Sequence, residues 1–329
     1  MEYVKCNLCG FDDTKLILRA RSRVMNVGEN FFKLAKCRRC GLVYLNPRPK
    51  KEEIKKYYPA WYHSRPPAKV TDITKTKIWG IPWQEAMKNK AEPILRYKKK
   101  GRILDIGCGD GSLLKFLKDS GWQTYGVELR DSSSLYARDV LGLNVFSGRF
   151  DEADYPEESF DVITLFHVLE HLPNPSGTLK KARMLLRKDG FLLIEVPNFH
   201  SFEAKVFRSN WVGISAPLHL YHFTPRTLQM MLKSCGLIPV EVRFIPEQTK
   251  YMAGYSESLR YCLMDLGLYP SRPKGTGLEE KKEEEGSSSS SSWISYLHHL
   301  EYLIFSSVAC LMDKIGKGLN LLVVARRRN

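Results

Sequence analysis

Residues 103–111 read Ile-Leu-Asp-Ile-Gly-Cys-Gly-Asp-Gly. The apolar pattern of a β-strand at 102–105 leads into three glycines at alternate positions, and a helical pattern with one apolar face follows at 113–117. A strand, a tight turn and a helix in this order open a doubly wound α/β domain. The glycines let the backbone turn sharply and approach a ligand, and the helix start presents free N–H groups to it.

Two acidic residues flank this turn. Asp105 precedes it, and Glu128 ends the next strand-like run, where its two oxygens could accept hydrogen bonds from the hydroxyls of a ribose. A nicotinamide fingerprint needs its third glycine three residues after the second, whereas the glycines here are evenly spaced. The pattern therefore predicts a nucleotide-type cofactor other than nicotinamide, bound by Asp105, Gly107, Gly109 and Glu128.

The stretch LDIGCGDG closely resembles motif I of class I S-adenosylmethionine (SAM) methyltransferases. Residues 159–163, SFDVI, and 170–172, EHL, agree with that family, and the resemblance runs from about 101 to 197 and again over the C-terminal tail. It implies SAM as cofactor, methyltransferase activity, and a Rossmann-like α/β sheet. In that sheet the last strand, 319–325, is inserted antiparallel between the fifth and sixth strands.

The same resemblance implies further cofactor contacts. The loop at 147–159 should lie beside the adenine, with Phe150 covering the ring and Asp151 or Glu152 meeting its amino group; a solvated acidic loop is the alternative. His167, where the fourth strand leaves the sheet, is a candidate cofactor-side contact. His171 follows one helical turn later at a spacing compatible with a base, although this stretch mainly shapes the methionine pocket in the related enzymes.

Four cysteines near the N-terminus form two matched units. Cys6 and Cys9 make one CxxC pair, Cys37 and Cys40 make the second, and glycine follows each pair. This is the arrangement of a zinc ribbon, in which two tight turns supply four thiolates to a tetrahedral structural Zn²⁺ with no open position for catalysis. Four reduced, buried cysteines are the alternative, but they would not account for two CxxCG units.

We expect a zinc-ribbon-like module with a short helix at 1–63, a linker rich in proline and lysine at 64–80, and the SAM-dependent methyltransferase domain at 81–329. The aromatic cluster at 57–62 either packs the small module against the large one or stacks on a base or sugar. The whole arrangement resembles microbial methyltransferases linked to surface-saccharide biosynthesis and also the sugar C-methyltransferases.

Residues 247–292 interrupt the family pattern. Their charged and serine-rich second part, 275–292, cannot bury a core and should be disordered, whereas 251–268 has helical character. The apolar helix at 293–315 contains His298, His299 and two acids, so we do not expect it to span a membrane. We expect it to pack on the sheet. The alternative is that it lies on a membrane surface or on a partner.

Local signals refine the element boundaries. Pro93 should kink or split the helix that precedes the first strand. Residues 188–190, Lys-Asp-Gly, should turn the chain into a fifth strand at 191–196. Thr224 should cap a helix that starts at Pro225.

The 329-residue chain has a net charge of +15, which favours an anionic partner. Eight cysteines without a signal-peptide pattern indicate a reducing, cytoplasmic setting. A sugar or glycan precursor, small or carrier-linked, is the first choice of methyl acceptor. RNA is the second choice, since zinc ribbons and basic patches occur there too, although no long basic and aromatic stripe is present. A non-catalytic binding module that kept the fold is the third interpretation.

Two histidines in the aromatic segment after the fifth strand are candidate catalytic bases. His219 and His222 lie in a loop that leaves the ligand-binding edge of the sheet, and a neutral imidazole suits deprotonation of a hydroxyl acceptor. The alternative is that both rings only pin the loop to the sheet. A metal-binding role is not expected, because no cysteine or acid lies close to them in the sequence.

Overall fold

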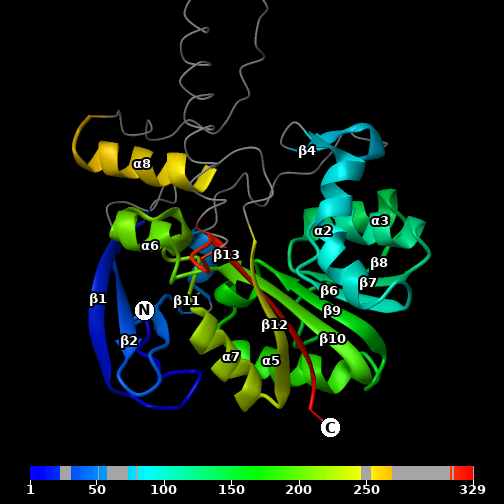
Figure 1. Ribbon diagram of the computed structural model, residues 1–329, viewed down its shortest axis with the longest axis horizontal. Coiled ribbons are helices and arrows are strands. Elements are labelled where there is room, and N and C mark those ends of the chain that lie inside the picture. Colours follow the sequence, from blue (N-terminus) through cyan, green and yellow to red (C-terminus); the bar gives the residue numbers. More distant parts are fainter. Residues whose placement is uncertain are drawn as a thin grey trace, which may run out of the picture.

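The computed structural model describes residues 1–22, 31–50, 52–57, 73–78, 81–245, 253–268, 312 and 315–328 (Figure 1). The expected disordered segment at 275–292 lies outside these residues, as do most of the aromatic cluster at 57–62, most of the linker at 64–80 and nearly all of the apolar helix at 293–315. Among the helices that are described, none has the length and apolar character needed to cross a membrane.

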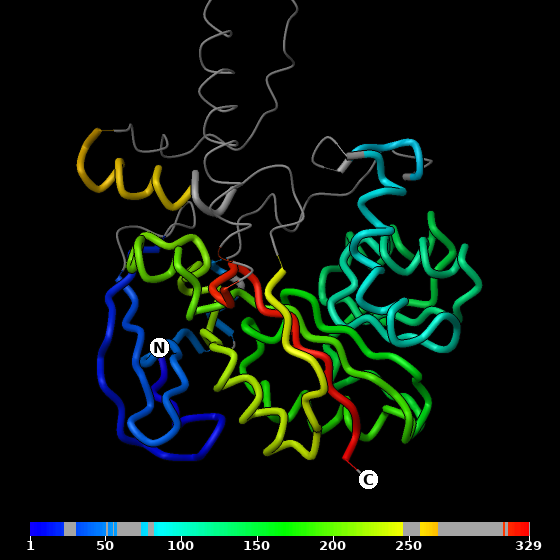
Figure 2. Tube along the Cα trace, in the orientation of Figure 1, coloured from blue at the N-terminus to red at the C-terminus, as the bar shows by residue number. Residues whose placement is uncertain are grey.

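Seven strands form the main sheet, in the spatial order β12-β13-β10-β9-β6-β7-β8. Their bounds are β6 Arg102–Ile106, β7 Gln123–Glu128, β8 Asn144–Ser147, β9 Phe160–Phe166, β10 Leu186–Pro197, β12 Leu237–Ile245 and β13 Asn320–Arg327. Strand β13 runs antiparallel between β10 and β12 (Figure 2), and the pairs from β10 to β8 are parallel. The predicted Rossmann-like sheet with an inserted antiparallel last strand is therefore confirmed.

Helices cover both faces of this sheet (Figure 1). Helices α2 (Trp83–Tyr97) and α3 (Ser112–Asp119) lie on one face, and α5 (Pro175–Leu185) and α7 (Pro225–Ser234) lie on the other. Successive residues of a strand point to opposite faces, so Ile103 packs with the α2 and α3 side chains while Leu104 packs with those of α5 and α7. Both side chains are fully buried, which explains why β6 reads as a continuous apolar run.

Two local predictions are wrong. Helix α2 runs through Pro93 as one 15-residue element, because the proline lies in its last turns and the helix is held by a buried face that includes Trp83 and Ile94. The expected turn at 188–190 lies inside β10, which begins at Leu186. A bulge between Leu186 and Phe191 absorbs these residues without ending the strand.

The N-terminal module forms a second sheet of four strands, three of them its own. These are β1 (Thr14–Arg21), β2 (Phe31–Cys37) and β3 (Val43–Leu45). The fourth, β11 (Tyr221–His222), comes from the segment after β10 and pairs antiparallel with β3. Buried residues of the module, Leu34, Leu42 and Leu45 among them, belong to the same hydrophobic core as the α5 and α7 face of the main sheet. The module and the large domain are thus joined by backbone pairing and by a common core.

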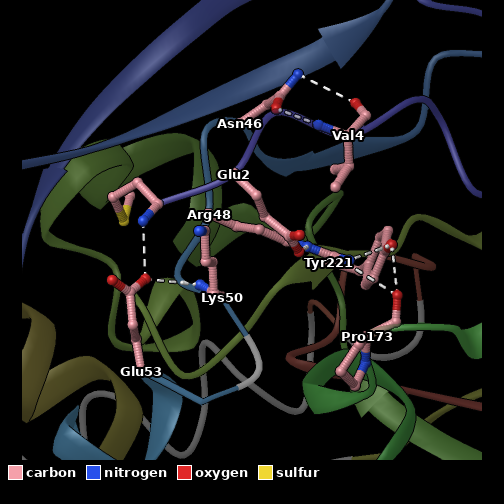
Figure 3. Close-up of polar contacts among 9 residues, drawn as sticks. Glu2, Val4, Asn46, Arg48, Lys50, Glu53, Pro173 and Tyr221 are labelled. Carbon is pink, nitrogen blue, oxygen red and sulfur yellow. Dashed lines mark hydrogen bonds and ion pairs between the residues drawn. The ribbon is translucent and has the colours of Figure 1, made fainter.

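A polar junction strengthens this joint (Figure 3). The Arg48 guanidinium donates to the Pro173 carbonyl at 3.0 Å and to the Tyr221 hydroxyl at 3.1 Å, and its Nε donates to a Glu2 carboxylate oxygen at 2.8 Å. Its side chain is only 11% exposed, so water competes weakly for these groups. Arg48 therefore holds the N-terminal strand segment, β11 and the turn before α5 together.

The segment between β10 and α7 contains α6 (Phe202–Phe207), the short 3₁₀ turns η5 (Arg208–Asn210) and η6 (Val212–Ile214), and β11. Helix α8 (Ala253–Asp265) packs on it. The Ser258 hydroxyl donates to the buried Glu203 carboxylate at 2.9 Å and accepts from the Val212 N–H at 3.0 Å. The helical character expected at 251–268 is therefore found at 253–265, where α8 packs on this segment.

Candidate functional site

The three glycines of the turn between β6 and α3 adopt left-handed backbone conformations, with φ values of 76°, 59° and 80° at Gly107, Gly109 and Gly111. A Cβ atom at Gly107 would lie 2.4 Å from a Val168 methyl group, and one at Gly111 would lie 2.5 Å from Leu143. A Cβ atom at Gly109 would meet no protein atom within 4 Å. Two of the glycines are thus required by packing, while Gly109 faces open space, as a backbone that receives a ligand must.

Glu128 shapes the rim of this turn. Its carboxylate is buried and accepts hydrogen bonds from the Gly109 N–H at 2.8 Å and the Arg130 N–H at 2.9 Å. Each oxygen has a second lone pair. The side chain can therefore hold the turn in place and still accept hydrogen bonds from a bound ligand.

Asp105 lies beneath the turn and not at its surface. Its side chain is 4% exposed and accepts a hydrogen bond from the Thr164 hydroxyl at 2.6 Å. Burial raises the pKa of Asp105 to about 6. The structure thus places this predicted cofactor residue behind the glycine backbone, where it ties β6 to β9.

One apolar residue at this rim was missed in the sequence. Leu129, next to Glu128, is 63% exposed. A large apolar side chain that stays in water beside an open glycine turn is well placed to cover a flat ring. Its signal in the sequence was an apolar residue directly after the acid that ends the second strand.

The loop expected to cover the adenine is arranged differently from the prediction. Phe150 belongs to the hydrophobic core, and the Lys181 ammonium lies 5.0 Å from its ring centre. Asp151 accepts two hydrogen bonds from the Arg149 guanidinium, at 2.9 and 2.7 Å, and a Glu152 oxygen accepts from the Arg149 N–H at 3.1 Å. The Phe150 ring is therefore already covered, and the two acids primarily organise the loop through Arg149.

His167 has a backbone φ of 56°, uncommon for a residue other than glycine. Its Nε2 lies 3.1 Å from a Glu195 oxygen and its Nδ1 lies 3.6 Å from a Glu170 oxygen. Burial opposes protonation, but the two carboxylates outweigh it and raise the pKa of His167 to about 10. The ring is thus a cation held between two acids at the end of β9.

A chain of contacts links the glycine turn to the segment that carries His219. Val168, whose methyl group closes the space over Gly107, precedes the 3₁₀ turn η4 (Leu169–His171). The carbonyl of Glu170 in that turn accepts a hydrogen bond from the Leu220 N–H at 2.8 Å. The rings of His171 and His219 meet edge to face, with centres 4.6 Å apart. The structure therefore places His219 against η4, and the residue before η4, Val168, contacts the glycine turn.

The two predicted bases differ in their surroundings. His222 is 3% exposed within β11, and its Nε2 donates to the Ile214 carbonyl at 3.2 Å. Burial lowers the pKa of His222 to about 4, and burial followed by the nearby His171 lowers that of His219 to about 3. An imidazole with so low a pKa is a weak base at neutral pH. His222 fits the structural alternative, and His219 is poorly matched to act as a base by itself.

An acid lies near His219 in space, although none is close to it in the sequence. Glu170 is far from it in the sequence, but one carboxylate oxygen of Glu170 and one ring nitrogen each of His171 and His219 lie within 4.8 Å of one another. The sequence could not show this proximity, because it depends on the Leu220 to Glu170 hydrogen bond between two distant segments.

The four N-terminal cysteines converge in the module. Their sulfur atoms lie within 4.8 Å of one another, with Cys6 to Cys40 at 3.4 Å and Cys9 to Cys37 at 3.6 Å. In a tetrahedral site with Zn–S bonds of about 2.3 Å, the sulfur atoms are about 3.8 Å apart, so the observed spacing fits. Gly10 and Gly41, which follow the pairs, have φ values of 71° and 84°. The N–H of each glycine donates to the backbone carbonyl of the first cysteine of its pair. The donor set fits a structural Zn²⁺.

Two hollows lie away from the glycine turn. One of about 90 Å³ is lined by residues of η5 and η6 together with Arg21 and Tyr261. That volume is too small for a SAM molecule. The second is an open basic depression lined by Arg183, Lys188, Asp189, Arg327 and Arg328. It lies where β10 begins, whereas ligands of such sheets bind at the carboxyl ends of the strands.

Comparison with known proteins agrees with this geometry. Residues 84–242 match a family model described as a methyltransferase domain. The chain is 33% identical over 107 residues to a ubiquinone biosynthesis O-methyltransferase of Glaesserella parasuis, covering 30% of this chain and 45% of that protein. It is 26% identical over 177 residues to the protein of that name from Hydrogenovibrio crunogenus, covering 49% and 73%. The chain thus spans about half to three quarters of the length of these relatives.

Among solved structures, the chain aligns with a SAM-dependent methyltransferase from Archaeoglobus fulgidus, with 19% identity, a TM-score of 0.45, and coverage of 74% of this chain and 94% of that one. A second is an S-adenosylmethionine-dependent methyltransferase from Mesorhizobium loti, with 15% identity, a TM-score of 0.45, and coverage of 74% and 100%.

Proposed function

We propose that this chain, whose residues 84–242 match a methyltransferase-domain model, is a class I SAM-dependent methyltransferase that transfers a methyl group from SAM to an oxygen atom of a small or carrier-linked acceptor. The observation that carries the proposal is the open face at Gly109 with the Glu128 carboxylate bonded to its N–H. The turn presents backbone to a ligand, and Glu128 keeps lone pairs for ribose hydroxyls beside it.

The acceptor side of this site is the segment around η4 and His219. The cofactor turn contacts Val168, and η4 contacts the His219 segment, so donor and acceptor would meet between them. Holding the two reactants in contact supplies much of the catalysis in such a transfer, because it removes the entropy cost of their encounter. Oxygen as the accepting atom is supported by the relatives, which are named as O-methyltransferases.

For the acceptor molecule we propose a sugar or glycan precursor, which suits the net charge of +15 if the precursor carries phosphate. The relatives' names point instead to ubiquinone biosynthesis, which makes a ubiquinone precursor the rival acceptor. RNA is less well supported, since the basic depression lies at the edge of the sheet opposite to the glycine turn.

We also propose that the cysteine cluster holds one structural Zn²⁺. Its four thiolates would complete the coordination of the ion, so no step of the reaction is assigned to it. Its role would be to hold β2 and β3, on which β11 is aligned.

The test is a binding and turnover series with the full chain. Calorimetry should show SAM binding with one site per chain. Formation of S-adenosylhomocysteine should then be measured with nucleotide-sugars, ubiquinone precursors and RNA side by side at two salt concentrations. Turnover with nucleotide-sugars would support the sugar assignment, turnover with only a rival acceptor would replace it, and failure to bind SAM would overturn the proposal.

A further inference from the structure

A second group of metal-type ligands lies at the acceptor side. Glu170 and His171 come from η4, and His219 comes from the segment before β11; we refer to these three residues as the Glu170 cluster. One ligand atom from each lies within 4.8 Å of the other two. No residue of this cluster belongs to the cysteine site.

Hydrogen bonding shows which atoms of the cluster are left over. The Nδ1 of His171 lies 3.0 Å from the Leu218 carbonyl, and the Nδ1 of His219 lies 2.9 Å from the Gly213 carbonyl. A carbonyl only accepts, so both Nδ1 atoms carry the proton, and in a neutral ring the Nε2 atom is then an unprotonated acceptor. Bonds of this kind are how proteins fix a metal-binding imidazole in one tautomer.

Among the described residues, no group donates a hydrogen bond to the Glu170 carboxylate. Its residue is 1% exposed, and both carboxylate oxygens are buried without a hydrogen bond. A buried carboxylate without hydrogen bonds is costly and calls for a bound ion or water. Two buried carboxylate oxygens without a hydrogen bond among the described residues thus lie beside His171 and His219, and one of them is within 4.8 Å of a ring nitrogen of each.

His167 does not fill this role. Its Nδ1 lies 3.6 Å from a Glu170 oxygen, too far for a hydrogen bond, while its Nε2 lies 3.1 Å from Glu195. His167 therefore gives neither Glu170 oxygen a hydrogen bond.

We propose that the Glu170 cluster binds a divalent transition-metal ion through Glu170, His171 and His219. A point equidistant from three atoms 4.8 Å apart lies about 2.8 Å from each, and zinc bonds to imidazole and carboxylate are about 2.0–2.2 Å, so side-chain movements below about 1 Å bring all three into range. Two imidazoles and one carboxylate suit zinc, iron or cobalt and not magnesium, which prefers oxygen ligands.

Three protein ligands leave at least one position of the ion open. If the proposed methyl transfer is correct, this position receives the acceptor oxygen, because η4 lies against the cofactor turn through Val168 and Gly107. A bound cation would lower the pKa of a coordinated hydroxyl, so that its proton is lost to water before the oxygen bonds to the SAM methyl group and S-adenosylhomocysteine leaves. Only this role rests on the proposed function; the binding of the ion does not.

Cobalt(II) is a suitable probe, because it distinguishes the two metal sites in one spectrum. Cobalt bound to cysteine thiolates gives an intense near-ultraviolet charge-transfer band, whereas cobalt bound to nitrogen and oxygen gives only weak visible bands. The full chain, purified with its cysteine site loaded with Zn²⁺, is titrated with Co²⁺ by calorimetry and absorbance, without SAM or acceptor. The variants are Glu170→Gln and His219→Gln, with His200→Gln as the matched control, because His200 is exposed and lies outside the cluster.

The expected result is one Co²⁺ per chain with weak visible bands in the wild type and in His200→Gln, and at least tenfold weaker binding in Glu170→Gln and His219→Gln. Wild-type protein that binds no Co²⁺ outside the cysteine site would overturn the proposal, whatever the variants do. Unchanged Co²⁺ affinity in a folded cluster variant would also overturn it. Because no methyl transfer is measured, a wrong acceptor assignment leaves this result unaffected.

Discussion

Replacing Gly109 by alanine separates the ligand role of the glycine turn from its role in folding. Gly109 has a φ of 59°, and an added Cβ would meet no protein atom within 4 Å. The free energy of unfolding of the variant should therefore fall by only about 1–2 kcal/mol, which is the cost of a left-handed backbone conformation at a residue with a side chain. If the turn receives SAM, the added methyl group occupies the surface on which the cofactor lies.

Gly121 provides a matched control. It lies just after α3, it has a φ of 88°, and its Cβ would also meet no atom within 4 Å. Gly121→Ala should thus cost a similar 1–2 kcal/mol for the same backbone reason. Gly107→Ala should cost more than either, because its Cβ would lie 2.4 Å from Val168.

Chemical unfolding measures the three stabilities, and calorimetry measures SAM affinity. We expect Gly109→Ala and Gly121→Ala to match in stability, with SAM affinity reduced at least tenfold, or about 1.4 kcal/mol, only in Gly109→Ala. A Gly109→Ala protein that binds SAM like Gly121→Ala would refute the assignment of this backbone to the cofactor.

Three further changes test the surroundings of the site. Between about pH 4 and 6 the folded protein keeps a proton on Asp105 that the unfolded chain has lost, so this group makes the free energy of unfolding fall as pH rises through that window. In urea unfolding, the stability of Asp105→Asn relative to wild type should therefore increase by up to about 3 kcal/mol from pH 4 to pH 7. A difference that stays constant with pH would contradict this. In thermal unfolding, Arg48→Met should lower the free energy of unfolding by about 2–3 kcal/mol, because it removes the buried hydrogen bonds of the junction. Arg38→Met, which removes an exposed ion pair, should lower it by less than 1 kcal/mol. Equal losses in the two variants would show that the Arg48 junction does not stabilise the fold. Cys37→Ser should remove one zinc per chain by elemental analysis and expose the N-terminal module to protease while SAM still binds, and full zinc content in the variant would exclude Cys37 as a ligand.

The features that the sequence predicted correctly are fixed either by local chemistry or by family resemblance. Three glycines between a strand and a helix favour a tight turn with left-handed backbone conformations, and Gly107, Gly109 and Gly111 all have positive φ values. The apolar run near the C-terminus is fully buried, and family resemblance placed it between β10 and β12 as found.

The features that could not be predicted depend on contacts between distant segments. Phe150 was expected to cover the adenine, whereas its ring lies in the core with the Lys181 ammonium beside it, a contact between segments 31 residues apart. Glu170 entered the sequence analysis only as part of the EHL stretch, and the return of the chain at Leu220 is what brings His219 to it. A two-residue strand such as β11 carries no periodicity from which its pairing with β3 could be read.

That short strand connects the cysteine cluster and the Glu170 cluster. On one side Tyr221 and His222 pair with Tyr44 and Val43, a few residues after the last cysteine, and the Leu45 N–H donates to the Leu220 carbonyl at 2.9 Å. On the other side the Leu220 N–H donates to the Glu170 carbonyl at 2.8 Å. The peptide groups of Leu220 thus bridge the cysteine module and η4, with His219 adjacent to the bridge. The cysteine module is therefore in a position to influence the geometry around η4, because a displacement of β3 would move Leu220, and with it His219, relative to Glu170.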